Sequence, residues 1–127
     1  MRLRNIPGAK ETIENNRFVV HQIQEKRNHW KDVFGNENPV HIEVGMGKGR
    51  FLMEMAALNP EINYVGIEMY DSVLLRAVQK MEEKQAEGTV PENLRFIRMD
   101  ARELPLVFDK NEVDRIYLNF SDPWPKE

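Results

Sequence analysis

The sequence contains no cysteine. This absence excludes disulfides, thiolate catalysis and cysteine-ligated metals, and it is typical of cytoplasmic proteins, so we expect a cytoplasmic protein. Apolar runs are also short, well below the roughly 20 residues that a bilayer span needs, and no apolar segment follows the basic N-terminus as in a signal peptide. We therefore expect no membrane partner. His21, His29 and His41 lack metal-ligand spacing, so we interpret them as surface or structural residues and expect no metal.

Charge is unevenly distributed along the 127 residues. The net charge is −3, which is not typical of a nucleic-acid-binding protein, and 41% hydrophobic with 31% charged residues is typical of a soluble globular domain. Residues 1–31 hold seven Lys and Arg against three Asp and Glu, whereas residues 32–127 hold eleven against eighteen. A basic arm thus precedes an acidic body, although accidental bias of a solvated surface explains the charges equally well.

Hydrophobic periodicity predicts an arm followed by an α/β domain. Residues 11–30 carry a weak amphipathic pattern that predicts a helix. A turn at 36–39 indicates a boundary, so we predict a basic arm with a helix at 1–36 and a second unit at 37–127. Trp30 is interpreted as a packing residue in preference to one that stacks on a base. The remainder alternates between predicted strands at 40–44, 62–67, 94–99 and 113–120 and helical segments at 50–58, 71–87 and 101–108. This order predicts an α/β fold with a parallel sheet.

Acidic residues lie at the carboxyl ends of the predicted strands or within a few residues of them. They are Glu43, Glu68, Asp100 and Asp122. In parallel sheets ligands bind beyond these strand ends, so the four acids are candidate binding residues. The alternative is that surface loops are rich in acids in any case, and for Asp71 we prefer the role of a helix N-cap.

The glycine turn E-V-G-M-G-K-G at residues 43–49 predicts the ligand. Gly45, Gly47 and Gly49 allow a sharp turn and a close approach of backbone to ligand. A dinucleotide motif would need glycine at position 50, which is Arg50, and a G-x-x-x-x-G-K-[ST] phosphate loop is absent as well. The carboxylate of Glu43 would repel a pyrophosphate but suits a cationic ligand. S-adenosylmethionine, with a sulfonium and an ammonium group, fits this turn.

Two further acids suit the nucleoside of that ligand. Glu68 lies 23 residues after Gly45 and is placed to accept hydrogen bonds from both ribose hydroxyls. Asp100, with the backbone of Ala101 beside it, is placed to accept from the adenine amino group. For each acid taken singly, a helix cap or a solvated loop position is the competing interpretation.

The segment N-F-S-D-P-W-P-K at residues 119–126 is the most distinctive. Two prolines around a tryptophan make a stiff loop that fixes Asp122, although a rigid turn with a packing tryptophan has the same spacing. Together with V-H-I-E-V-G-M-G-K-G-R-F at 40–51, Y-V-G-I-E at 64–68 and M-D-A at 99–101, this segment resembles the bacterial tRNA (guanine-N7)-methyltransferase family. The resemblance covers residues from about 37 to the end.

The resemblance implies a Rossmann-like class I fold and a specific reaction. Members of the family transfer a methyl group from S-adenosylmethionine to guanine N7 in the tRNA variable loop. Glu43, Glu68, Asp100 and Asp122 match donor-binding acids, Asp122 also matches the proposed catalytic residue, and Lys126 matches an RNA contact. The family continues with three further strands, so we expect only the N-terminal four strands here, in a part that need not be active alone.

Two alternatives stay open at this point. One is a methyltransferase for another RNA or a small molecule, and the other is a non-catalytic nucleoside-binding partner subunit. The sequence leaves the oligomeric state undetermined.

Overall fold

The computed structural model describes residues 8–118. Its elements in chain order are α1 (Ala9–Asn15), the 3-10 helix η1 (Ile23–Lys26), α2 (Trp30–Phe34), β1 (Val40–Val44), α3 (Arg50–Leu58), β2 (Asn63–Glu68), α4 (Asp71–Glu87), β3 (Leu94–Arg98), the 3-10 helix η2 (Ala101–Glu103), α5 (Leu104–Val107) and β4 (Arg115–Leu118). None of the helices within this range combines the length and apolar character that a membrane crossing requires.

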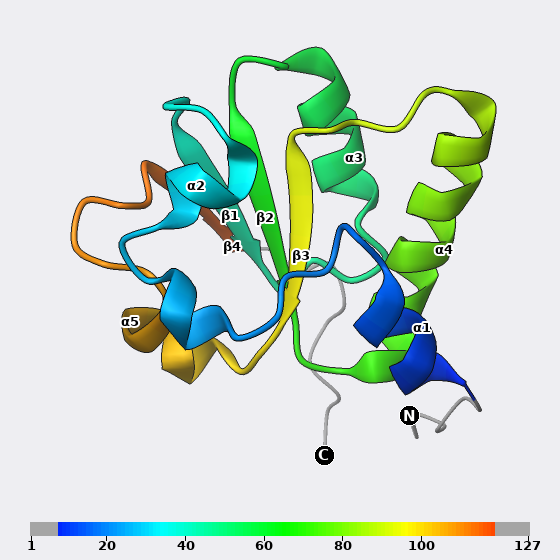
Figure 1. Cartoon of the computed structure of the whole chain (residues 1–127), viewed down its shortest axis with the longest axis horizontal. Helices are drawn as coiled ribbons and strands as arrows, with labels where there is room; N and C mark the ends of the chain where they lie inside the picture. The colour runs from blue at the N-terminus through cyan, green and yellow to red at the C-terminus, as the bar shows by residue number, and fades with distance from the viewer. Residues whose placement is uncertain (1–7, 119–127) are drawn as a thin grey trace.

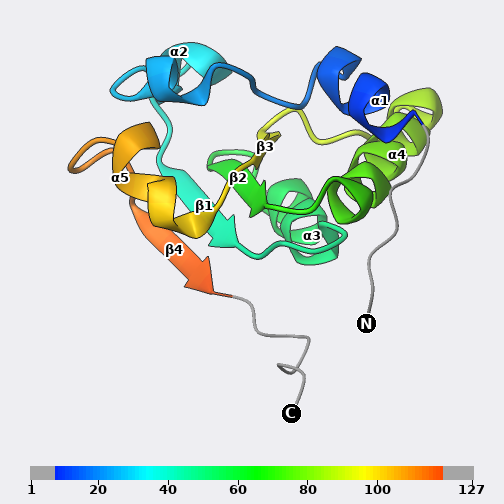
Figure 2. The ribbon, with the colours of Figure 1, turned by 90° about the horizontal axis from the view of Figure 1, so that it is seen from below.

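The four strands form one parallel sheet in the order β3-β2-β1-β4 (Figures 1 and 2). Val44 lies opposite Ile67 on one side and Leu118 on the other, so β1 is an inner strand. The chain adds β2 and β3 on one side of β1 and then returns to place β4 on the other. The predicted Rossmann-like α/β fold with four parallel strands is confirmed.

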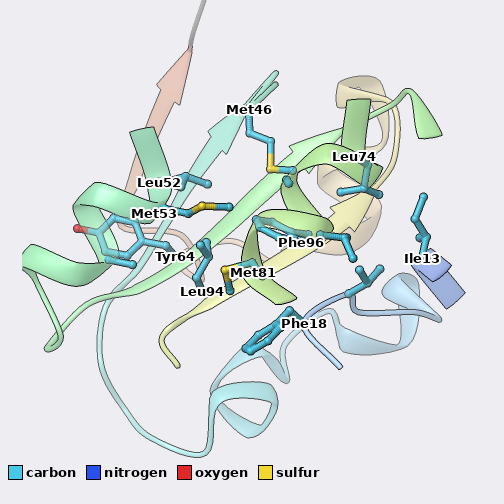
Figure 3. Packing of buried hydrophobic residues seen from close by; sticks show 14 residues of the cluster. Ile13, Phe18, Met46, Leu52, Met53, Tyr64, Leu74, Met81, Leu94 and Phe96 are labelled. Atoms are coloured by element: carbon cyan, nitrogen blue, oxygen red, sulfur yellow. The ribbon is translucent and has the colours of Figure 1, made fainter. Parts of the chain in front are cut away.

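Helices cover both faces of the sheet. In Figure 1, α1, α3 and α4 lie on one side, while α2 and α5 lie on the other. Strand alternation supplies each face with apolar residues, because successive side chains point to opposite faces. Figure 3 shows the core on the α3–α4 side, which includes Leu52, Tyr64, Leu74, Met81, Leu94 and Phe96. The opposite core includes Trp30, Val40, Ile42, Val65, Ile67, Ile97 and Phe108.

The segment predicted as one helix at 11–30 is different in the structure. α1 ends at Asn15, and the following residues run beside β3, where Val19 bridges to Phe96. The Val20 amide donates to Phe96 O at 2.8 Å, and the Phe96 amide donates to Phe18 O at 2.8 Å. The prediction of a continuous helix was wrong because the open edge of β3 offers backbone partners, and consecutive Phe18 and Val19 are both buried there.

Trp30 confirms its interpretation as a packing residue. Its side chain is fully buried, stacks on Phe108 with ring centroids 4.8 Å apart, and donates from Nε1 to Val107 O at 2.9 Å. Glu112 fixes the same region, since its carboxylate accepts from the amides of Asn28, Trp30 and Asp109 at 2.8, 3.0 and 2.9 Å. The N-terminal segment is therefore attached to the loop before β4. The domain boundary near residue 36 stays a prediction.

Candidate functional site

The carboxyl ends of β1 and β4 lie at the point where the strand order reverses. β1 leads into a crossover toward β2, whereas β4 lies on the other side of β1. Doubly wound sheets bind ligands beyond the carboxyl ends of their strands at such a reversal of strand order. The predicted residues Glu43, Gly45 and Gly47 lie at the end of β1 and in the turn that follows it.

The glycine turn has the backbone geometry that its sequence predicts. Gly45, Gly47 and Gly49 have φ values of 76°, 62° and 79°, in the left-handed region that favours glycine. The amides of Gly45 and Met46 both donate to Ile67 O at 3.0 Å, which fixes the turn against the end of β2. A Cβ at Gly49 would lie 3.3 Å from Ala77 Cβ, so this glycine also permits close packing of α4.

Glu43 is buried at the end of β1. Glu43 is 1% exposed. Strand alternation directs its side chain to the α3 face of the sheet, whereas Ile42 and Val44 point to the opposite face. In register it lies between Gly66 on β2 and Tyr117 on β4. A buried carboxylate needs hydrogen-bond donors or positive charge to offset its lost hydration. Glu43 lies directly before the glycine turn, at the edge of the sheet where a ligand would bind.

Glu68 connects the end of β2 to the glycine turn. Its Oε1 accepts from the Gly47 amide at 3.1 Å, and its Oε2 accepts from the Tyr70 amide at 3.2 Å. The structure thus brings two predicted site residues, Glu68 and Gly47, into direct contact. These contacts fix the orientation of the Glu68 carboxylate beside the glycine turn.

Asp100 follows β3 and is the N-cap of the 3-10 helix η2. Its Oδ1 accepts from the Arg102 amide and from Arg102 Nε at 2.9 and 3.1 Å, and its Oδ2 accepts from Arg102 Nη2 at 2.8 Å. Hydrogen bonds from the Arg102 side chain, and then from its amide, lower the pKa of Asp100 to about 2. Arg102 was not among the residues predicted from the sequence, although its position two residues after Asp100 was a local signal.

Three further residues beside this edge differ from expectation or were missed. Asp71 is the first residue of α4, whose N-cap is Tyr70, and its carboxylate pairs with Arg98, so the predicted N-cap role is wrong. The charge of Arg98 at the end of β3 explains the change, because an ion pair replaces a capping hydrogen bond. Met69 and Tyr70 directly follow Glu68 and are about half exposed, which places apolar surface next to the predicted ribose acid.

Asp122 and Lys126 lie outside the described residues. Their predicted roles therefore stay predictions, as do the ligand contacts of Glu43, Gly45, Gly47, Glu68, Asp100 and Ala101. Among residues 8–118, no group of three or more His, Asp or Glu side chains is arranged to hold a metal ion. His41 is half-buried beside Tyr64, at the opposite end of the sheet, and burial lowers its pKa.

Comparison with known proteins identifies the family. Residues 37–127 match the model of the family described as "Putative methyltransferase". The chain belongs to this methyltransferase family. A tRNA (guanine-N(7)-)-methyltransferase of Lachnoclostridium phytofermentans is 57% identical over 127 residues, and one of Bacillus cytotoxicus is 52% identical over 128 residues. Both alignments cover 100% of the chain and confirm the resemblance carried by its motifs. The chain spans 57% of the length of each of these relatives.

Solved structures agree with the fold. An antibiotic-related methyltransferase superposes with a TM-score of 0.66 at 25% identity, over 87% of this chain and 52% of the other. An aminoglycoside resistance methyltransferase gives a TM-score of 0.60 at 26% identity, over 73% of this chain and 44% of the other. These likenesses support the Rossmann-like fold of the parallel sheet and its helices.

Proposed function

We propose that the protein transfers a methyl group from S-adenosylmethionine to the N7 atom of a guanosine in the tRNA variable loop. The observation that carries this proposal is 57% identity over all 127 residues to a relative named tRNA (guanine-N(7)-)-methyltransferase. Since the chain spans only part of such relatives, substrate and activity are proposed for the complete protein. We propose the cytoplasm as its compartment, because the sequence has no cysteine.

The described residues fit the methyl donor at its charged end. The carboxylate of Glu43 is buried below a turn whose glycines bring backbone to the surface of the site. The amino-acid part of S-adenosylmethionine carries an ammonium group, and a charge-assisted hydrogen bond to a buried carboxylate is among the stronger polar contacts. A phosphate-bearing ligand would instead be repelled by Glu43.

The nucleoside end of the donor fits the next two strands. Glu68 would accept hydrogen bonds from the ribose hydroxyls, and its contacts with the Gly47 and Tyr70 amides hold its carboxylate beside the turn. Asp100 and Ala101 lie at the end of the adjacent strand, where an adenine ring would extend from that ribose. Met69 is exposed between the end of β2 and the start of α4, and it offers an apolar surface for the adenine ring.

The chemistry requires positioning more than proton transfer. Guanine N7 carries a lone pair at neutral pH, and when bound S-adenosylmethionine supplies an electrophilic methyl carbon. The N7–carbon bond forms as the carbon–sulfur bond breaks, and the electron pair of that bond remains on sulfur. The protein must hold the two atoms in line at attack distance. The purine becomes cationic, so the carboxylate of Asp122 would stabilise the developing charge or hold the base by its amino edge. Lys126 would contact the RNA.

Methyl transfer by the complete protein tests the reaction. We expect tritiated methyl groups from S-adenosylmethionine to appear on guanosine of unmodified tRNA. Asp122→Ala should abolish transfer while weakening binding of S-adenosylhomocysteine much less, and Asp32→Ala, an exposed acid on α2, should change neither. Transfer to another base or acceptor would support the other methyltransferase alternative. Donor binding without transfer to any RNA would support a non-catalytic subunit.

Calorimetry tests the donor site separately. Glu43→Gln keeps the shape of the side chain but removes the negative charge, so the dissociation constant for S-adenosylhomocysteine should rise by about tenfold or more. Glu54→Gln on the exposed side of α3 is the matched control and should leave binding unchanged. Equal affinities for the two variants would exclude Glu43 from the donor site.

A further inference from the structure

We propose that Arg102 positions the carboxylate of Asp100 to accept a hydrogen bond from the 6-amino group of the donor's adenine, and thereby makes the site selective for a 6-aminopurine. This inference rests on the proposed use of S-adenosylmethionine. It adds a specificity-determining residue that acts through Asp100.

The contacts of Arg102 determine the orientation of Asp100. Three donors of Arg102, the backbone amide, Nε and Nη2, reach the carboxylate at 2.8 to 3.1 Å. The guanidinium is planar and its donors are fixed relative to one another, so the Nε and Nη2 contacts to different oxygens set the plane of the carboxylate. The amide contact additionally fixes Oδ1 to the first turn of η2.

Counting acceptor positions shows where a ligand can bind. A carboxylate accepts about four hydrogen bonds, roughly two on each oxygen. Arg102 fills both positions on Oδ1 and one on Oδ2, which leaves one position on Oδ2. An adenine amino group can donate to that position while Arg102 stays in place. A 6-oxo group at the same place would set an acceptor against Oδ2.

The charge of the carboxylate strengthens this selectivity. A protonated Asp100 could donate to a 6-oxo group and accept such a ligand. A carboxyl with the ordinary pKa of 3.8 is already ionised at neutral pH, and hydrogen bonds from Arg102 lower the pKa of Asp100 further to about 2, so the carboxylate can only accept.

A comparable ion pair at the other end of β3 provides a matched control. Arg17 donates from Nη1 and Nη2 to both oxygens of Glu92 at 3.0 and 2.9 Å. Both arginines are exposed, Arg102 with 90% and Arg17 with 46% of the side chain accessible, so neither pair should contribute much to stability. Of these two pairs, that of Arg102 with Asp100 lies at the carboxyl edge of the sheet, and that of Arg17 with Glu92 does not. Loss of either arginine should therefore leave the fold intact.

The test is calorimetry of the complete protein with S-adenosylhomocysteine and its 6-oxo analogue, S-inosylhomocysteine. We expect the wild-type protein to prefer the 6-amino ligand by about ten- to a hundredfold, the range for a hydrogen bond to a charged group. Arg102→Ala should reduce this preference to about threefold or less, mainly by weakening the 6-amino ligand. Arg17→Ala should retain the wild-type preference.

Arg102→Lys separates geometry from charge. Lysine keeps the positive charge without the planar fork, so its preference should fall nearly as far as that of Arg102→Ala. A wild-type preference in Arg102→Lys would assign the effect to charge and overturn the positioning role. Tighter binding of S-adenosylhomocysteine to Arg102→Ala would show that Arg102 competes with adenine, and would also overturn it. An unchanged preference in Arg102→Ala would overturn this inference alone, whereas no binding of S-adenosylhomocysteine to the wild-type protein would overturn the proposed donor as well.

Discussion

Gly66 in the middle of β2 is expected to tolerate no side chain. All seven glycines lie in the described part of the chain, and Gly66 alone among them lacks a positive φ, so its backbone would accept alanine. A Cβ at this position, however, would lie 2.2 Å from Met46 Sδ and 2.8 Å from Leu52 Cδ1. These side chains and Phe96 converge on the α3 face of the sheet (Figure 3). The restriction at Gly66 is therefore steric and comes from packing.

Gly66→Ala should destabilise the protein although alanine normally suits a strand better than glycine. Both contacts are shorter than real Cβ atoms show, so Met46 and Leu52 must move within a closely packed core. Overpacking of this kind costs about 1 to 3 kcal/mol. For a chain of this size, each kcal/mol lowers the melting temperature by about 4 °C, which gives an expected fall of about 4 to 12 °C in thermal unfolding.

A double-mutant cycle with Met46 identifies the cause. Met46→Ala removes the closest atom, so Gly66→Ala should cost about 1 kcal/mol less in that background than in the wild-type protein. Because Met46 lies between Gly45 and Gly47, Gly66→Ala should also weaken binding of S-adenosylhomocysteine. An unchanged or higher melting temperature for Gly66→Ala would refute the steric argument. Additive effects of the two substitutions would show that the strain lies elsewhere.

Three other substitutions test separate parts of the structure. The side-chain amide of Asn93 donates to the carbonyls of Ala56, Asn59 and Ile62 at 3.1, 3.1 and 2.8 Å. Asn93→Ala removes these contacts and should lower the free energy of unfolding, measured in urea, by about 1 to 3 kcal/mol. An unchanged free energy of unfolding would show that water replaces the amide. Glu112→Gln replaces a carboxylate that accepts from three backbone amides by a side-chain amide, which has a donor on one side. The amides of residues 28–30 should then exchange hydrogen faster, whereas unaltered exchange would show that Glu112 does not hold this segment in place. Burial lowers the pKa of His41, so the unfolded chain binds its proton more readily and stability should fall as pH drops below the unfolded pKa near 6.5. His41→Gln should reduce the loss of melting temperature between pH 7 and 5, and an unchanged loss would remove His41 from this acid sensitivity.

The regular part of the fold was predictable because local patterns and tertiary packing agree there. Strand β1 and helix α3 have the bounds that their apolar patterns predict. The glycines between them have positive φ values, as the turn requires. The carboxyl-edge positions of Glu43, Glu68 and Asp100 also follow directly from strand order, since parallel strands place their ends along one edge.

The N-terminal segment was not predictable from periodicity because its partners are distant in sequence. Phe18 and Val19 fit one face of a helix, but β3 offers them backbone hydrogen bonds and a buried site about 77 residues away. Asp71 was assigned to a local cap for the same reason. Its partner Arg98 belongs to another strand, and only the register of β2 with β3 brings the two together.

At Glu68 and Asp100, contacts that stabilise the fold are compatible with a role in ligand binding. Glu68 holds the glycine turn through Gly47, and Asp100 accepts from the amide of Arg102 as a helix cap would. A carboxylate accepts about four hydrogen bonds, so the three contacts from Arg102 leave Asp100 one acceptor position. The structural contacts fix the orientation of both carboxylates before a ligand arrives. Each side chain therefore loses little conformational entropy when the proposed donor binds, because the fold already holds it in place.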